Sequence, residues 1–170
     1  MPASPLHLLR VNARELLRVP GTTRPVAAEL DAQTLGLDDD RIVGPISVAL
    51  EAVSNLDGVV VHGTVSVPWT APCRRCLVSV TGNVVVDVDE VYQDVVVDED
   101  AFAIEGDQID LTPAVREYVM IELPDGPLCR VDCAGICPVC GTDRNERQCD
   151  CDTSVRDDRW AALDDLKLDE

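Results

Sequence analysis

The chain has 170 residues, of which 46% are apolar and 3% aromatic, and its formal net charge at pH 7 is −18. This length suits one compact domain with an appendage, and the charge excludes non-specific nucleic-acid binding over the whole surface, because acidic groups repel phosphate backbones. With eight cysteines, no signal-peptide pattern and no apolar run near the ~20 residues that cross a bilayer, we expect a cytoplasmic, non-membrane protein whose thiols bind metal.

The N-terminus is the only basic part of the chain. Residues 1–30 carry four arginines against two glutamates, whereas residues 31–170 carry ten basic against thirty acidic side chains. This acidity serves solubility in any case, and it leaves the N-terminus as the one place for a local phosphate contact. The candidate residues are Arg14, Arg18 and Arg24, and the alternative is an ordinary solvated face.

The first half of the chain is rich in strand signals. Residues 6–11 are predicted to form a strand, and residues 13–19 a short helix that ends at a Pro-Gly pair. Period-two alternation over 46–51 and 59–67, with turn residues at 55–58 between them, predicts a β-hairpin.

The alternation continues further along the chain. Residues 77–80 and 84–88 are predicted to form a second strand pair around a turn at 81–83, and residues 94–106 an edge strand or mobile loop. The fold expected is therefore α+β and β-rich, with antiparallel strands in a small sheet or barrel-like core and a few short helices.

One helix is predicted after the strands. Thr112 is expected to cap it, Pro113 fits its first turn, and Pro124 ends it. Its predicted apolar stripe consists of Leu111, Val115, Tyr118 and Val119.

Three regions follow from this organisation. We expect a β-rich domain with short helices at 1–122 and a cysteine-rich, zinc-binding segment packed on it at 123–152. Residues 153–170 are expected to form an acidic helix or tail, with Asp157 as cap and an apolar side made of Trp160, Leu163 and Leu166.

The strongest chemical signal is Cys137-Pro-Val-Cys140 followed by Gly141. A CxxC pair with glycine after it turns tightly enough to direct backbone N–H groups at both sulfurs, and such donors favour thiolates. Zinc takes four such ligands, so Cys137 and Cys140 are predicted to be two of them.

The remaining ligands come from a pool of late cysteines. Cys149 and Cys151 are the natural second pair, and Cys129 and Cys133 compete for the same role. The alternatives are buried free cysteines, or an iron–sulfur cluster, for which no ferredoxin spacing is present.

An earlier pair, Cys73 and Cys76, encloses two arginines. It either joins two late cysteines on a second ion or forms a turn without ligands, so the sequence predicts one zinc ion and leaves room for a second. A thiol oxidoreductase is disfavoured, because strand alternation rather than a helix follows the pair.

These motifs together resemble the YceD family. The resemblance rests on Cys73-Arg-Arg-Cys76-Leu, Ile109-Asp-Leu111 before a helix, Leu123-Pro124, and the late cysteines with Asn145 between them. It implies a bacterial or plastid protein needed for normal levels of large-subunit ribosomal RNA, often encoded beside a large-subunit ribosomal protein. Since members without the late cysteines exist, it also implies that the metal supports the fold.

We therefore expect a non-enzymatic ribosome-biogenesis factor that supports large-subunit ribosomal RNA accumulation or processing by binding. Its expected partner is a ribosomal protein or a large-subunit assembly intermediate, since the charge does not favour direct contact with ribosomal RNA. The alternatives are a zinc-ribbon adaptor outside the ribosome and a thiol oxidoreductase acting through Cys73 and Cys76. A zinc hydrolase is disfavoured because His7 and His62 lie far from the late cysteines.

Overall fold

The computed structural model describes residues 5–97, 100–153, 159 and 161. The chain divides into two compact units. The sheet unit consists of Met1–Ala71 and Ser79–Asp125, and the cysteine-rich unit consists of Pro72–Val78 and Gly126–Glu170. Residues 72–78, which the sequence places within the β-rich region, therefore group with the late cysteines.

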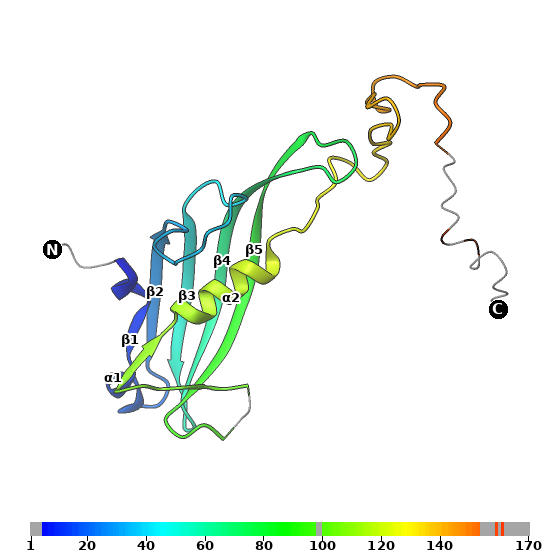
Figure 1. Cartoon of the computed structure of the whole chain (residues 1–170). Coiled ribbons are helices and arrows are strands. Elements are labelled where there is room, and N and C mark those ends of the chain that lie inside the picture. Colours follow the sequence, from blue (N-terminus) through cyan, green and yellow to red (C-terminus); the bar gives the residue numbers. More distant parts are fainter. Residues whose placement is uncertain (1–4, 98–99, 154–158, 160, 162–170) are drawn as a thin grey trace. The chain divides into compact units, whose positions relative to one another are not determined.

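The sheet unit is built on a five-stranded sheet in which each strand lies beside its neighbour along the chain (Figure 1). The pairs β2–β3 and β3–β4 are antiparallel, and the short β5–β6 pair is parallel. The strands are β2 (Thr23–Leu30), β3 (Ile46–Ser54), β4 (Val59–Pro72), β5 (Ser79–Gln93) and β6 (Phe102–Ala103). This confirms the β-rich α+β prediction, and the β3–β4 pair confirms the predicted hairpin.

One face of the sheet carries the hydrophobic core. Alternate residues of the strands are fully buried, including Val48, Val61 and Val65. The helix α2 (Thr112–Glu122) lies across this face in Figure 1 and buries Val115 and Val119. Both helix residues belong to the predicted apolar stripe, which follows from their 3.6-residue spacing.

The N-terminal elements differ from the prediction. Residues predicted as one strand form a 3-10 helix, η1 (Pro5–Leu9), followed by a short strand, β1 (Arg10–Asn12). The predicted helix is present as α1 (Ala13–Leu17), so Arg10 lies outside it. β1 pairs antiparallel with β7 (Gln108–Asp110), and neither β7 nor β2 was predicted.

The predicted turn at 81–83 is wrong, because β5 continues through it without interruption. Gly82 is there for packing: a Cβ at this position would lie 2.7 Å from Cζ2 of Trp69. A glycine that accommodates a neighbouring aromatic ring gives the same sequence signal as a turn glycine. Of the segment 94–106, two residues form β6.

The start of α2 also corrects the sequence analysis. Thr112 lies within the helix, and the capping position, Leu111, makes no side-chain hydrogen bond. Instead, the Asp110 carboxylate accepts from the Thr112 N–H at 2.9 Å. The helix ends before Pro124, as predicted.

The C-terminal helix predicted around Asp157 and Trp160 lies outside the described residues. Among the residues that the structure does describe, no helix has the length and apolar character needed to span a membrane.

Candidate metal centre

The eight cysteines gather into two groups of four within the cysteine-rich unit. The first cluster consists of Cys73, Cys76, Cys129 and Cys133, and the second of Cys137, Cys140, Cys149 and Cys151. Within each cluster all four Sγ atoms lie within 4.8 Å of one another. The structure thus places Cys149 and Cys151 with the CxxC pair, and Cys129 and Cys133 with the early pair.

The spacing of the sulfurs fits a tetrahedral metal ion. In the first cluster the Sγ atoms of Cys73 and Cys133 are 3.8 Å apart, and those of Cys76 and Cys129 are 3.6 Å apart. A disulfide would need about 2.05 Å. Four thiolates at about 2.3 Å from one ion are separated by about 3.8 Å along the edges of the tetrahedron. Each cluster can therefore hold a metal ion.

A tight hydrogen-bonded turn positions the first CxxC pair. The Cys73 N–H donates to the carbonyl of Val78 at 2.8 Å, and the Leu77 N–H donates back to the Cys73 carbonyl at 2.9 Å. The Arg75 N–H points at the Cys73 sulfur at 3.5 Å. This is the geometry in which backbone donors stabilise a thiolate.

The second CxxC pair lies in a turn of the same type. The Cys137 N–H donates to the Thr142 carbonyl at 2.8 Å, and the Gly141 N–H donates to the Cys137 carbonyl at 2.9 Å. Gly141 has φ +72°, and Leu77, its counterpart in the first turn, has φ 62°. A leucine therefore occupies a left-handed position that costs an L-residue roughly 1–2 kcal/mol.

Within each cluster, the four thiols differ in pKa. Backbone donors, led by the N–H of Cys129, lower the pKa of Cys73 to about 6, and the Thr142 hydroxyl lowers the pKa of Cys140 to about 6. Burial raises the pKa of the Cys129 thiol to about 12, and the neighbouring Cys140 sulfur raises that of Cys151 to about 12. Four thiolates at this separation repel one another, so a bound cation is needed to ionise a whole cluster.

Asn145 joins the two clusters. It lies between Cys140 and Cys149 in sequence, yet its Nδ2 donates to the Cys133 sulfur of the first cluster at 3.4 Å. Its Oδ1 accepts from the Ala134 N–H at 2.8 Å and from Arg130 at 2.7 Å. The side chain of one loop thus orients a ligand of the other cluster.

The backbone adds a second link between the clusters. The Ile136 N–H donates to the carbonyl of Arg75 at 2.9 Å, and the Arg75 guanidinium donates to the Cys133 carbonyl at 2.9 Å. Gly135 permits this approach, since a Cβ there would lie 2.9 Å from the Arg75 oxygen. The two CxxC turns are therefore parts of one hydrogen-bonded body.

The donor sets are those of a structural site. Each cluster offers four sulfurs, which complete tetrahedral coordination and leave no open position for a substrate. The histidines lie elsewhere: His7 is in η1 and His62 is in β4, beside Glu51 at 4.0 Å. Neither joins a cluster.

The predicted phosphate-binding arginines do not converge on one anion site. Arg14 pairs with Asp107 at 2.7 Å, and Arg14 and Arg18 line a shallow hollow that also contains Asp94 and Asp107. Arg24 lines a different hollow, shared with Glu15.

Sequence reasoning left one feature of this centre open and missed another. It gave the pair Cys73–Cys76 either as ligands of a second ion, together with two late cysteines, or as a turn without ligands, and the structure groups the pair with Cys129 and Cys133. Asn145 was noted only as part of a motif, and its contact with Cys133 depends on tertiary structure.

Comparison with family models shows which protein family the chain belongs to. The family model described as "Large ribosomal RNA subunit accumulation protein YceD" matches residues 61–167, which contain all eight cysteines. The chain belongs to the YceD family. This confirms the resemblance seen in the sequence.

Three YceD relatives illustrate the range of similarity. An uncharacterised protein of Mycobacterium leprae is 39% identical over 106 residues, covering 58% of this chain and 48% of that protein. One of Mycobacterium tuberculosis is 35% identical over 121 residues, covering 67% of this chain and 57% of that protein. The large ribosomal RNA subunit accumulation protein YCED homolog 1, chloroplastic, of Arabidopsis thaliana is 32% identical over 60 residues, covering 35% of this chain and 19% of that protein.

The chain thus spans about half the length of the mycobacterial relatives that it matches. No solved structure matches it.

Proposed function

We propose that this protein supports the accumulation of large-subunit ribosomal RNA by binding, without catalytic turnover, in the cytoplasm. The observation that carries the proposal is the family match over residues 61–167. The chloroplast relative that is named for this role supports it.

We assign zinc to both clusters, as a structural element. Zinc favours four-thiolate tetrahedral sites and has no redox chemistry of its own. When bound, one ion would link Cys73 with Cys133, and the other would link Cys137 with Cys149. These links would stabilise a unit that has little hydrophobic core of its own. The cysteine-rich unit exposes Leu77, Val131 and Val139 instead of packing them into a core.

A basic protein is the partner that the charge distribution favours. The sheet unit carries six basic and 21 acidic side chains, a net charge of −15. By contrast, residues 72–78 and 126–153 carry five of each. The acidity is thus concentrated on the sheet unit. An acidic surface attracts a basic ribosomal protein, free or within an assembly intermediate, and repels RNA.

The alternatives are weaker on specific grounds. A thiol oxidoreductase would form and break a disulfide between Cys73 and Cys76. In the structure, however, the Cys73 sulfur lies beside Cys133 and the Cys76 sulfur beside Cys129, within one four-sulfur cluster. Direct binding of ribosomal RNA through the N-terminal arginines is weakened by the carboxylates beside them. An adaptor outside the ribosome is not favoured by the family.

Co-sedimentation tests the proposal. The tagged full-length chain is returned to a host strain that lacks its own copy, and lysates are fractionated on sucrose gradients at physiological salt. We expect the protein to travel with particles lighter than the mature large subunit, and the ratio of large- to small-subunit ribosomal RNA to fall in its absence. Sedimentation only at the top of the gradient, with normal ribosomal RNA, would refute the proposal.

A further inference from the structure

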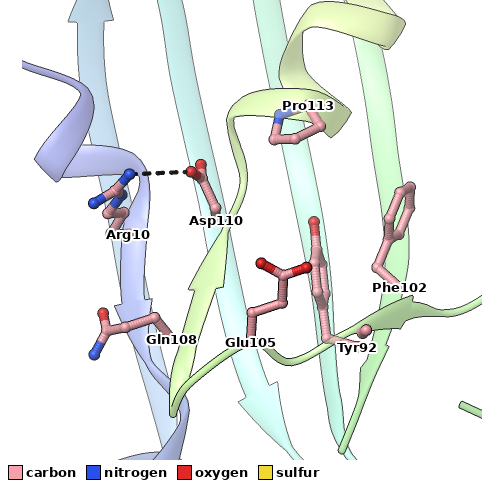
Figure 2. Close-up of a pocket in the computed structure, with 8 residues that line it drawn as sticks. Arg10, Tyr92, Phe102, Glu105, Gln108, Asp110 and Pro113 are labelled. Carbon is pink, nitrogen blue, oxygen red and sulfur yellow. Dashed lines mark ion pairs between the residues drawn. The ribbon is translucent and has the colours of Figure 1, made fainter.

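The sheet unit contains a cavity, with both apolar and charged lining residues, that the metal centre does not use (Figure 2). Its volume is about 490 Å³, and it opens between the β1–β7 pair and the β5–β6 pair. Residues from five segments line it, among them Arg10, Tyr92, Phe102, Glu105, Asp110 and Pro113.

Tyr92 places a polar group in the wall of this cavity. Its side chain is 97% buried, and its ring stacks on Phe102 with centroids 5.4 Å apart. The structure shows no hydrogen bond between its hydroxyl and a described residue, and Figure 2 shows the hydroxyl directed between Asp110 and Pro113. Among the described residues no fully buried side-chain oxygen or nitrogen lacks a partner, so this hydroxyl reaches the solvent of the cavity and is available to a ligand there.

The carboxylates around Tyr92 determine the sign of the charge that such a ligand carries. Asp110 pairs loosely with Arg10, at 3.5 Å. Glu105 is exposed and forms no ion pair with any residue that the structure describes. Arg10, Glu105 and Asp110 together carry a net charge of −1, so the cavity favours a cation.

The remaining lining residues define the shape of that cation. Phe102 and Pro113 form apolar walls beside the carboxylates. Lysine and arginine side chains have this combination, because an apolar methylene stem carries a charged head. A simple metal ion or a phosphate would leave the apolar walls without a contact.

We propose that this cavity receives a lysine or arginine side chain from a basic segment of a protein partner. The stem packs against Phe102 and Pro113, the cationic head donates to Glu105 and Asp110, and the Tyr92 hydroxyl accepts one further hydrogen bond. Only the expectation that the partner is ribosomal rests on the proposed function.

A peptide titration on the full-length, metal-loaded chain tests this proposal. The probe is a nine-residue peptide with three arginines separated by glycine and serine, and its matched control replaces each arginine with citrulline, which has nearly the same shape and no charge. Calorimetry measures affinity, and backbone NMR shifts locate the site. We expect the arginine peptide to shift Tyr92, Phe102 and Glu105, and the citrulline peptide to bind at least tenfold more weakly.

Matched variants separate a specific site from general attraction to an acidic surface. Glu105→Gln and Glu29→Gln each remove one negative charge, but Glu29 lies on the exposed face of the edge strand β2 and does not line the cavity. We expect Glu105→Gln to weaken the arginine peptide roughly five- to tenfold, Tyr92→Phe about two- to fivefold, and Glu29→Gln less than twofold. Circular dichroism checks that each variant is folded.

Three results would overturn the proposal. They are equal weakening by Glu105→Gln and Glu29→Gln, equal binding of the citrulline peptide, or tighter binding of a uridine decanucleotide that Arg10→Ala abolishes. The last result would make the cavity a nucleic-acid contact. Since the peptide titration needs no ribosome, its failure is separate from a failure of co-sedimentation.

Discussion

The side-chain amide of Asn145 lies 3.4 Å from the sulfur of Cys133, although Asn145 lies in the loop of the second cluster and Cys133 belongs to the first. Asn145 is held in place by Asp143, whose carboxylate accepts from the Asn145 backbone and side-chain N–H groups at 2.8 and 2.7 Å. The loop that joins the two ligand pairs of the second cluster therefore also supports the first cluster. Metal in one cluster should strengthen the binding of metal in the other.

The first prediction concerns this link. We expect Asn145→Ala to lower the metal affinity of the first cluster by roughly 10- to 100-fold, as is usual when a partner of a ligand is removed. Cobalt titration against a chromophoric chelator measures this loss, and Asn83→Ala is the control, since the Asn83 side chain bonds to Ser66 on the sheet, outside both clusters. Unchanged affinities at both clusters would show that the contact is incidental.

The second prediction concerns the number of ions. The purified protein is expected to carry two zinc ions, and the double replacements Cys73→Ser/Cys76→Ser and Cys137→Ser/Cys140→Ser are each expected to remove one. Because structural zinc contributes of order 10 kcal/mol of apparent binding energy, protease should then cut the cysteine-rich unit while the sheet keeps its far-ultraviolet spectrum. Iron with sulfide, or an unchanged metal content in either variant, would contradict this.

The third prediction compares the two CxxC turns. Gly141→Ala forces a side chain into a left-handed position, and we expect it to lose roughly 1 kcal/mol of metal-binding free energy, since no atom lies within 4 Å of the new Cβ. Leu77→Gly relieves the same strain, and should leave metal binding unchanged or improve it by up to about 1 kcal/mol. Loss of metal in Leu77→Gly would mean that the exposed leucine side chain itself holds the turn.

The fourth prediction concerns pH and the sheet unit. Arg41 donates to both carboxylate oxygens of Asp39, at 3.0 and 2.7 Å, and to the Pro124 carbonyl at 3.0 Å. This contact holds the pKa of Asp39 below its usual value of 3.8. A carboxylate with a lowered pKa stabilises the fold above its unfolded pKa, and this contribution is lost as the pH falls through its folded pKa.

We therefore expect Asp39→Asn to destabilise the sheet unit by roughly 1–3 kcal/mol at pH 7, and by progressively less below pH 3.8. Urea unfolding across this pH range measures the difference. Asp38→Asn is the control, because Asp38 is exposed and shows no bond to Arg41. A cost that stayed constant down to the lowest pH would exclude the ion pair as its cause.

The sequence predicted those parts of the fold that depend on neighbours along the chain. The hairpin of β3 and β4 follows from alternation and a local turn, and the end of α2 follows from Pro124. Gly82 shows where this reasoning fails. Its role depends on Trp69, which lies on the neighbouring strand, so no local pattern could distinguish it from a turn residue.

The same division applies to the metal centre. The sequence predicted a cluster of thiols around Cys137 and Cys140 and placed these two in one turn, because backbone geometry over four residues fixes that arrangement. The partners of the early pair were decided by tertiary structure: Cys73 meets Cys133 from 60 residues away, and Cys76 meets Cys129 from 53. Contacts of that range depend on where β4 ends and β5 begins, and on where the chain returns after α2, which no local spacing encodes.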